Sequence, residues 1–323
     1  MERILISLAI CFVFLGCSGG SGTSGKSNEE QEKPVENIKT VPLADPYILL
    51  HEGTYYAYGT HSDDGIEVYT SNNLKQWKYA GLALHRKDSW GDKWFWAPEV
   101  YYLNGRYYMF YSAEEHVCVA TGDSPLGPFK QEKQEPMIGW EKCIDNTLFV
   151  DEDGKKYMFF DRFNDGLNIW SVELNDDMSV NQNTLHPCIH VSQKWEEVWP
   201  RVNEGAFVWK YDGKYYLVYS ANSYESQMYG VGFAVTDKIG ETWTKYEKNP
   251  VLQCPKDLVG VGHGALFTDK EGKLRYVFHA HHNKQNIHPR DMYITTASFD
   301  KDGNMQLSDD YIIPELVTSD SNR

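Results

Sequence analysis

Positive charge is scarce in this sequence. Lysine and arginine together number 31, against 46 aspartate and glutamate residues, which leaves a net charge of −15. Such an excess of negative charge does not suit a protein that binds nucleic acid or anionic lipid, so we expect neither as a partner. Helical periodicity is lacking as well. No window repeats its apolar residues every 3.6 positions, and we therefore expect few helices.

Cysteine is also rare, with six in the whole chain. Cys11 and Cys17 lie in the N-terminal segment. The spacing of the other four matches no zinc motif, and two disulfides among them would suit an oxidising compartment. These four are Cys118, Cys143, Cys188 and Cys254. The sequence alone does not define how they pair.

No hydrophobic run is long enough to cross a membrane as a helix. The apolar segment at residues 4–15 has roughly a dozen residues, whereas a spanning helix needs about 20. It follows Arg3 and ends at Gly16-Cys17, which is typical of a signal peptide. Because Phe14-Leu15-Gly16-Cys17 is similar to a bacterial lipobox, we expect residues 1–17 to be a lipoprotein signal peptide with Cys17 lipidated. Ordinary cleavage that discards Cys17 is the alternative.

The segment that follows should be a tether to the cell envelope of a bacterium. Residues 18–40 consist of Ser, Gly, Glu, Lys and Asn with almost no apolar side chains, so they cannot bury enough surface to fold. The folded part then covers residues 41–317, long enough for one large domain. We expect a monomer that contacts the membrane only through its lipid anchor.

A five-fold repeat is the most informative feature of the remaining sequence. Five times a turn with a glycine precedes an aromatic run, as in Glu52-Gly53 followed by Tyr55-Tyr56-Ala57-Tyr58. The turn glycines lie 52, 49, 59 and 59 residues apart, at Gly53, Gly105, Gly154, Gly213 and Gly272. Each supplies the positive φ that a tight hairpin needs.

Further apolar segments complete each repeat. A short strand precedes every turn, and a third follows at residues 66–69, 117–120, 167–170, 231–235 and 292–295. Residues 77–79 and 243–245 suggest a fourth strand in two repeats. Three or four antiparallel strands repeated five times predict an all-β, five-bladed β-propeller with a central channel. A β-sandwich is the alternative, but it does not explain five equivalent hairpins.

Acidic residues occur where the repeats begin. The repeats open with Asp45-Pro46, Pro98-Glu99, Asp145-Asn146, Glu204-Gly205 and His263-Gly264. Since the first strand of a propeller blade is innermost, these side chains should converge near the axis. Each could separately be a turn former, a surface charge or a core histidine. Together they predict a functional site, because crowded carboxylates raise one another's pKa and cost stability.

Two carboxyl groups, one protonated and one ionised, are the minimal equipment for hydrolysis of a glycosidic bond. A third can tune and orient the acid. A glycan-binding, lectin-like propeller is the alternative from another class. It would repeat one binding motif in every blade, whereas these openings differ.

The openings Ala44-Asp45-Pro46-Tyr47, Trp96-Ala97-Pro98-Glu99, Ile144-Asp145-Asn146 and Asn203-Glu204-Gly205 resemble glycoside hydrolase family 43. Residues 124–129, Ser-Pro-Leu-Gly-Pro-Phe, also match that family. The resemblance covers nearly all of residues 43–305. It implies a five-bladed propeller that hydrolyses plant polysaccharide side chains or oligosaccharides with inversion.

The resemblance also implies roles for individual residues. Asp45 would be the general base, Glu204 the general acid, and Asp145 the residue that tunes and orients the acid. His263 and Arg290 would lie in the sugar pocket, and Trp96 would offer an apolar face to the sugar. No cofactor is expected to be required. A structural calcium near His263 is an option from some relatives, although no further acidic ligand is evident there.

The resemblance leaves the sugar open among α-L-arabinofuranose, β-D-xylose and β-D-galactose, with some relatives endo-acting on arabinan. The segments at residues 192–203 and 224–229 should narrow the channel into a pocket, which favours exo cleavage. The sequence reading is therefore an exo-acting α-L-arabinofuranosidase, with β-xylosidase as the next alternative and galactosidase or arabinanase after it.

Overall fold

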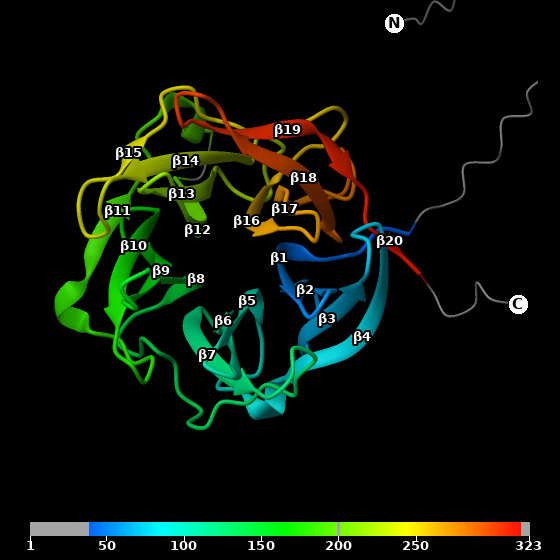
Figure 1. Cartoon of the computed structure of the whole chain (residues 1–323), viewed down its shortest axis with the longest axis vertical. Coiled ribbons are helices and arrows are strands. Elements are labelled where there is room, and N and C mark those ends of the chain that lie inside the picture. The colour runs from blue at the N-terminus through cyan, green and yellow to red at the C-terminus, as the bar shows by residue number, and fades with distance from the viewer. Residues whose placement is uncertain (1–38, 199–200, 318–323) are drawn as a thin grey trace, which may run out of the picture. The chain divides into compact units, whose positions relative to one another are not determined.

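The computed structural model describes residues 39–198 and 201–317. Almost all of the ordered elements are strands, and the only helices among these residues are three single 3₁₀ turns, at Arg86–Asp88, Gln182–Thr184 and Lys194–Glu196. The strands form five antiparallel blades arranged in a ring (Figure 1). The predicted five-bladed β-propeller is therefore confirmed.

The blades follow one another along the chain. Blade 1 contains β1 (Ala44–His51), β2 (Thr54–Thr60), β3 (Gly65–Ser71) and β4 (Gln76–His85). Blade 2 contains β5 (Trp96–Leu103), β6 (Arg106–Ala113) and β7 (His116–Gly122). Blade 3 contains β8 (Cys143–Val150), β9 (Lys156–Phe163), β10 (Leu167–Leu174) and β11 (His186–Ile189). Blade 4 contains β12 (Asn203–Tyr211), β13 (Lys214–Ala221), β14 (Gly230–Thr236) and β15 (Thr244–Lys245). Blade 5 contains β16 (Gly262–Thr268), β17 (Leu274–Ala280), β18 (Asp291–Phe299) and β19 (Met305–Ile312).

The five turn glycines connect the first and second strands of the blades, as the sequence predicts. Their φ angles lie between 75° and 85°. An added Cβ would meet nothing within 4 Å at any of them, so the backbone conformation and not the available space requires glycine here. The spacing of these turns therefore reports the blade repeat directly.

The first strand of each blade lies innermost, around the centre of the ring (Figure 1). Each of them has a register irregularity just after it begins. At each irregularity one residue has a positive φ: Asp45, Ala97, Asp145, Gly205 and His263. Aspartate and histidine tolerate this conformation better than most residues. The bulges re-aim side chains at the start of the inner strands.

These five residues also correct one detail of the sequence reading. Glu204 precedes the bulge residue Gly205, so it is the counterpart of Ala44 and Ile144 and not of Asp45 and Asp145. Glu99 follows its bulge and lies two residues beyond Ala97 on the inner strand. The acidic residues therefore occupy three different positions of the repeat. Sequence spacing alone had treated them as equivalent.

A ring of five hydrogen bonds links the blades at the level of the bulges. In each blade a polar side chain of the second strand, opposite the bulge, accepts the backbone N–H of the bulge residue in the next blade. The five bonds are Ala97 to Thr60 (2.9 Å), Asp145 to Ser112 (2.9 Å), Gly205 to Asp161 (3.0 Å), His263 to Ser220 (2.7 Å) and Asp45 to His279 (3.0 Å). These bonds satisfy buried donors that the bulge removes from the sheet.

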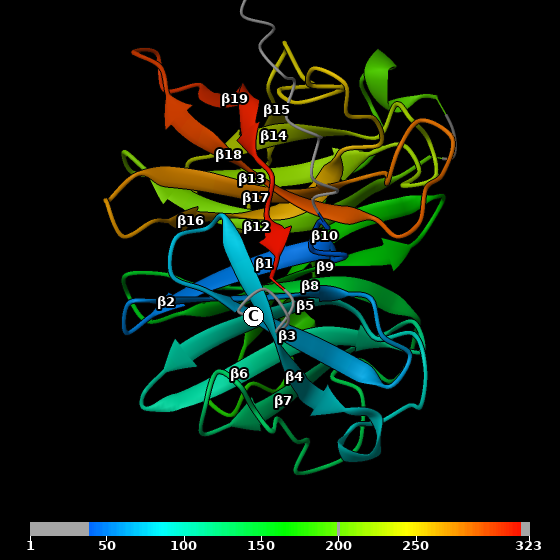
Figure 2. The ribbon, with the colours of Figure 1, turned by 90° about the vertical axis from the view of Figure 1, so that its right-hand side faces the viewer.

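The two ends of the described chain meet at blade 1. Strand β20 (Glu315–Leu316) pairs in parallel with the outer strand β4 (Figure 2). Thr40 forms an antiparallel bridge with Glu315, and the Val41 N–H donates to the Pro314 carbonyl. The first and last blades are thus joined through the segments that flank β1 and follow β19.

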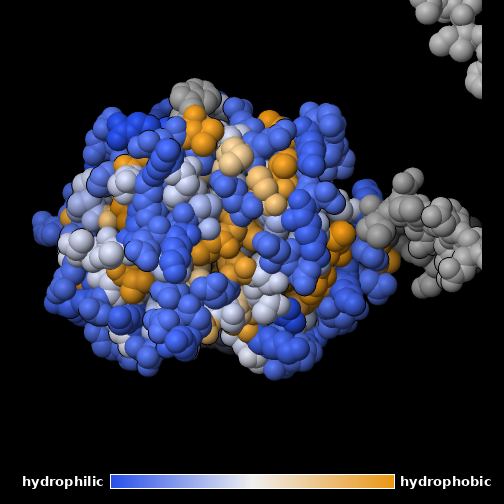
Figure 3. All heavy atoms as spheres, turned by 90° about the horizontal axis from the view of Figure 1, so that it is seen from above, coloured by the Kyte–Doolittle hydropathy of each residue, from blue (hydrophilic) through white to orange (hydrophobic). Residues whose placement is uncertain are grey.

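The surface is mainly hydrophilic. Hydrophilic residues predominate on the face seen in Figure 3, with apolar residues between them. Within the described ranges no helix is long and apolar enough to cross a membrane.

The four cysteines of the propeller do not form disulfides. Cys118, Cys143, Cys188 and Cys254 are free thiols, so neither of the two suggested disulfides is present. The predicted signal peptide, Cys17 and most of the predicted tether lie outside the described residues.

Candidate active site

Asp45 lies at the centre of a group of cationic and imidazole side chains. Arg290 donates from both terminal nitrogens to its carboxylate, at 2.8 and 3.3 Å. The Nδ1 atoms of His263 and His279 each lie 3.3 Å from Oδ1. Burial alone would raise the pKa of Asp45, but Arg290 and then His263 hold it well below its usual range. Asp45 is therefore the ionised carboxylate of the site.

Asp145 is buried among other carboxyl groups. Its Oδ2 lies 3.8 Å from Nδ1 of His263, so that histidine stands between Asp45 and Asp145. Burial, followed by the charges of Glu204 and Asp45, raises the pKa of Asp145 well above its usual range. The pKa values of the two aspartates are thus shifted in opposite directions, although both occupy the bulge position of their blades.

Glu204 is held by a buried tyrosine. The hydroxyl of Tyr229 donates to Oε1 of Glu204 at 2.7 Å. Burial raises the pKa of Glu204 to about 7, while the Tyr229 bond lowers it and the charge of Asp45 raises it further. Glu204 can therefore hold a proton under mildly acidic conditions in which Asp45 is ionised. This pair of states is the one that acid–base cleavage of a glycosidic bond requires.

Glu99 does not join this group. Its carboxylate accepts the hydroxyl of Tyr101, which also contacts the Thr147 hydroxyl at 3.0 Å. Burial raises the pKa of Glu99 to about 8. None of Asp45, Asp145 or Glu204 is among the groups that affect it. The position of Glu99 beyond the bulge explains this separation.

One of the two segments where the sequence predicted narrowing reaches the site, and the other is hydrogen-bonded to the same loop. The loop between β13 and β14 carries Tyr229 to Glu204 and places the ring of Tyr224 4.5 Å from the Arg290 guanidinium. Asn222 of this loop donates to the Trp195 carbonyl at 3.0 Å and accepts the Val198 N–H at 3.0 Å. The two segments are thus hydrogen-bonded to each other beside the channel.

A buried polar network anchors the segment that leads to Glu204. Lys245 donates to the fully buried Glu196 at 2.6 and 2.8 Å and to Oδ1 of Asn203 at 2.7 Å. Glu196 also accepts the Tyr219 hydroxyl at 2.6 Å. Because Asn203 directly precedes Glu204, the network determines where the inner strand β12 begins.

A model of the glycosyl hydrolases family 43 matches residues 34–305 of the sequence. The chain belongs to this family. It is therefore a glycoside hydrolase, and its substrate is a carbohydrate.

Solved structures and curated proteins agree with the family assignment. An endo-1,4-β-xylanase from Bacteroides thetaiotaomicron has a TM-score of 0.84 and 44% identity, covering 87% of this chain and 99% of that chain. A thermostable family-43 glycoside hydrolase has a TM-score of 0.79 and 33% identity, covering 84% and 95%. An extracellular exo-α-(1→5)-L-arabinofuranosidase from Streptomyces chartreusis is 27% identical over 281 residues, covering 79% of this chain and 84% of the relative.

In this family 43 hydrolase, the three side chains assigned to the sugar pocket have different neighbours. Arg290 and His263 both contact Asp45, as described above. Trp96 is half-buried and stacks on Trp94, with ring centroids 5.8 Å apart and an interplanar angle of 15°. Trp94 is 43% exposed, so this pair presents an aromatic surface at the start of blade 2. Aromatic surfaces of this kind suit the apolar faces of sugars.

The calcium suggested near His263 stays a prediction. Among the described residues no group of three or more His, Cys, Asp or Glu side chains could hold a metal ion. His263 Nδ1 faces Asp45 and Asp145, and burial lowers the pKa of this histidine. We therefore assign no step of the reaction to calcium.

Four residues of the site escaped sequence analysis: Asp161, Tyr229, His279 and Tyr224. Asp161 and His279 belong to the second strands, at the position opposite the bulge. A polar residue at the end of an aromatic run, as in Phe159-Phe160-Asp161, was the available signal, and aligning the second strands would have revealed it. Tyr224 and Tyr229 bound the segment that the sequence predicted to narrow the channel, but no local pattern assigned a contact to either side chain.

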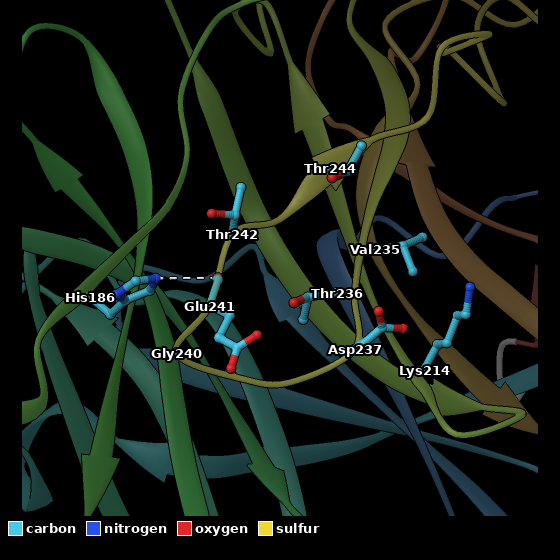
Figure 4. A pocket seen from close by; sticks show the side chains of 9 residues that line it. All are labelled: His186, Lys214, Val235, Thr236, Asp237, Gly240, Glu241, Thr242 and Thr244. Carbon is cyan, nitrogen blue, oxygen red and sulfur yellow. Dashed lines mark hydrogen bonds between the residues drawn. The ribbon is translucent and has the colours of Figure 1, made fainter.

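A groove lies away from this chemistry. It has a volume of about 620 Å³ and is lined by residues of β13 to β15 together with His186 and the turn at Asp237 to Glu241 (Figure 4). The groove lies at the C-terminal end of β14, at Thr236, whereas Glu204 lies toward the N-terminal end of that strand. No channel carboxyl group and no Trp, Tyr or Phe lines it. The active site is therefore placed at the carboxyl cluster and not here.

Proposed function

We propose that the protein is an inverting, exo-acting α-L-arabinofuranosidase that removes arabinose from plant polysaccharide side chains or oligosaccharides. Asp45 is the general base that activates water, Glu204 is the general acid, and Asp145 tunes and orients Glu204. The observation that carries these roles is the difference in partners: Arg290 and two imidazoles contact Asp45, whereas the hydroxyl of Tyr229 donates to Glu204.

The base and the acid come from blades that are not neighbours. In the ring β1 contacts β5 and β16, whereas Glu204 is on β12, between β8 and β16. Placement on non-adjacent blades favours a wide separation of the two carboxyl groups, which leaves room for a water molecule on the face of the sugar opposite the leaving group. In-line attack by that water inverts the anomeric configuration.

Glu204 and Asp145 are coupled in this mechanism. The charge of Glu204 is the first electrostatic cause, after burial, of the raised pKa of Asp145. When Glu204 carries its proton, that charge is absent and Asp145 ionises more readily. In the active form Glu204 is then protonated and Asp145 is a carboxylate. The negative charge of Asp145 opposes release of the proton from Glu204 until the leaving oxygen of the substrate accepts it.

A β-xylosidase is the second candidate. The solved endo-1,4-β-xylanase shares 44% identity and a TM-score of 0.84 with this chain, which favours a xylose-based substrate. The arabinofuranosidase from Streptomyces chartreusis favours the first candidate at lower identity. Both sugars are pentoses, and the same carboxyl groups would act on either.

Exo cleavage is supported by the two loops at the channel. The bond between Tyr229 and Glu204 and the packing of Tyr224 on Arg290 bring the β13–β14 loop against the acid and the base. A loop held against the site in this way suits the end of a glycan chain better than its middle. The product distribution tests this. We expect free monosaccharide from the first turnovers, and mixed oligosaccharides appearing first would contradict the exo assignment.

A panel of nitrophenyl glycosides tests the sugar, and proton NMR of the first-formed product tests the stereochemistry. We expect hydrolysis of the α-L-arabinofuranoside, with the β-D-xyloside as the second choice, and an inverted anomeric configuration. Preference for the xyloside would exchange the two candidates. Retention of configuration would show that the roles assigned to Asp45 and Glu204 are wrong.

A further inference from the structure

Asp161 differs from the other acceptors in the ring of five hydrogen bonds. In four blades the acceptor is a hydroxyl or an imidazole, on Thr60, Ser112, Ser220 and His279. Blade 3 instead uses the carboxyl group of Asp161. A hydroxyl suffices for this task in three of the five blades. Asp161 is fully buried, and burying a carboxyl group is costly. Its second oxygen therefore requires an explanation.

That second oxygen, Oδ1, lacks an ordinary donor. Oδ2 accepts the Gly205 N–H, but no N–H or hydroxyl among the described residues donates to the buried Oδ1. The charged side chain that acts most strongly on Asp161 is Asp145, which directly follows Ile144, the strand partner of Asp161. Two carboxyl groups can form a hydrogen bond only when one of them carries a proton. A bond from the free Oδ1 to Asp145 would therefore require a proton on this pair.

Blade 1 contains the same arrangement with a hydroxyl. Thr60 accepts the N–H of Ala97 in the next blade, and its hydroxyl also helps to lower the pKa of Asp45 in its own blade. A hydroxyl lowers the pKa of a carboxyl group by directing its proton toward the carboxylate. In blade 3 the equivalent residue is Asp161, and Asp145 is the equivalent of Asp45. A protonated Asp161 would make the same two bonds as Thr60.

We propose that Asp161 is a positioning residue which, as a carboxylic acid, donates Oδ1–H to the carboxylate of Asp145 while Oδ2 accepts the N–H of Gly205. This proposal rests on the proposed function, because it assigns to Asp161 the orientation of Asp145 beside the acid. Through Gly205, the same side chain also fixes the backbone next to Glu204. Asp161 thus connects two functional carboxyl groups without contacting the substrate.

The surrounding charges keep the proton on Asp161. Asp145 on β8 and Glu204 on β12 face it, and both are acidic. Arg290, Asp45 and His263 act on Asp145 from the other side. Burial, and then the charges of Asp145 and Glu204, raises the pKa of Asp161 well above its usual range. No cation is among the groups that oppose this.

Two substitutions separate the donor role from the charge. In Asp161→Asn the amide oxygen can accept the Gly205 N–H and the amide nitrogen can donate to Asp145, so kcat should stay within a few-fold of wild type. Asp161→Ala removes both bonds, and kcat should fall about ten- to hundred-fold through misplacement of the acid. Ser220→Ala is the matched control, because it removes the cap of His263 N–H but no carboxyl group. It should lower the melting temperature much as Asp161→Ala does, while leaving the number of protonated carboxyl groups unchanged.

Infrared spectroscopy of the full chain at neutral pH counts the protonated carboxyl groups directly. Asp161→Asn should lose one carboxylic-acid signal relative to wild type, while the signal of the protonated Glu99 remains. An unchanged acid signal, or an Asn variant as inactive as the Ala variant, would overturn the proposal. The infrared result does not depend on turnover. If the wild-type protein cleaves no glycoside, the proposed function is refuted. The infrared result still decides whether Asp161 carries the proton.

Discussion

At the scale of single residues, neighbouring side chains give two buried carboxyl groups opposite ionisation. Asp45 is surrounded by Arg290 and two imidazoles, whereas Glu204 has Tyr229 as its hydrogen-bond donor. Both are acidic residues close to the start of an inner strand. Their different partners, and not their positions in the sequence, separate their roles.

Substitution of the base and the acid should have different consequences. Asp45→Asn should abolish turnover for every leaving group, because no carboxylate remains to activate water. Glu204→Gln should keep measurable activity on aryl glycosides whose leaving groups need little protonation, and lose at least about 10²-fold on natural linkages. Steady-state rates on nitrophenyl and unactivated substrates compare the two. Full activity of Asp45→Asn would contradict the assigned base.

The pH–rate profile should follow the two pKa values. Activity requires ionised Asp45 and protonated Glu204. The pKa of Asp45 is held well below its usual range, and that of Glu204 is raised to about 7. We therefore expect activity to persist at low pH until the fold is lost, and to fall as the pH rises through about 7.

Tyr229→Phe tests the origin of that upper limit. The Tyr229 hydrogen bond lowers the pKa of Glu204, so its removal should raise the pKa and move the basic limb to higher pH. Tyr216→Phe is the matched control, because its hydroxyl donates to the carbonyl of Gly303, away from the site. A basic limb that moves downward in Tyr229→Phe, or equally in both variants, would contradict this account.

At the scale of elements, the bulges decide which side chains enter the channel. The hairpins were predictable because glycine and aromatic runs mark them locally. The bulges were not, since they depend on how the first and second strands pair. This is why sequence spacing treated Glu204 and Asp45 as equivalents, and why Asp161 and His279 opposite the bulges escaped notice.

Gly205→Ala tests the bulge of blade 4. Gly205 has a φ of 63°, and a Cβ there would lie 2.8 Å from the ring of His263. Backbone strain and crowding should together cost about 2–4 kcal/mol of unfolding free energy, and the displaced histidine should lower kcat. Gly213→Ala is the control, since its φ is also positive but nothing lies within 4 Å. It should cost about 1 kcal/mol and leave activity intact. Equal effects in urea unfolding would show that His263 yields to the added methyl group.

At the scale of the whole molecule, β20 holds the first and last blades together. Its segment makes four backbone hydrogen bonds: Glu315 N–H to Lys75, Leu316 to Lys39, Val317 to Trp77, and Val41 to Pro314. Ending the chain at Ile313 removes all of them. We expect a loss of about 2–4 kcal/mol and a melting temperature roughly 5–15 °C lower. A chain that ends at Val317 keeps these bonds and is the control. An unchanged melting temperature in the shorter chain would show that β20 does not hold the ring together.

We also propose that the enzyme is attached to the cell envelope through lipid on Cys17. The Gly16-Cys17 junction and the polar residues 18–40 support this. Cys17→Ala should yield soluble enzyme with unchanged specific activity, because the substitution lies outside the propeller. Cell fractionation and mass spectrometry of the N-terminus measure it. Wild-type protein recovered in the soluble fraction without an acyl chain would refute the anchor.

The sequence by itself determined the class of fold and the family. Glycine turns and aromatic runs act locally, so five blades and the acidic openings Asp45, Asp145 and Glu204 could be read in order along the chain. Only the tertiary structure decided which atoms meet. Ring closure brings second-strand residues such as Asp161 and His279 against the next blade's backbone, and it folds Tyr229 onto Glu204. Those contacts set the ionisation of the carboxyl groups, because burial and charge depend on residues far apart in the chain.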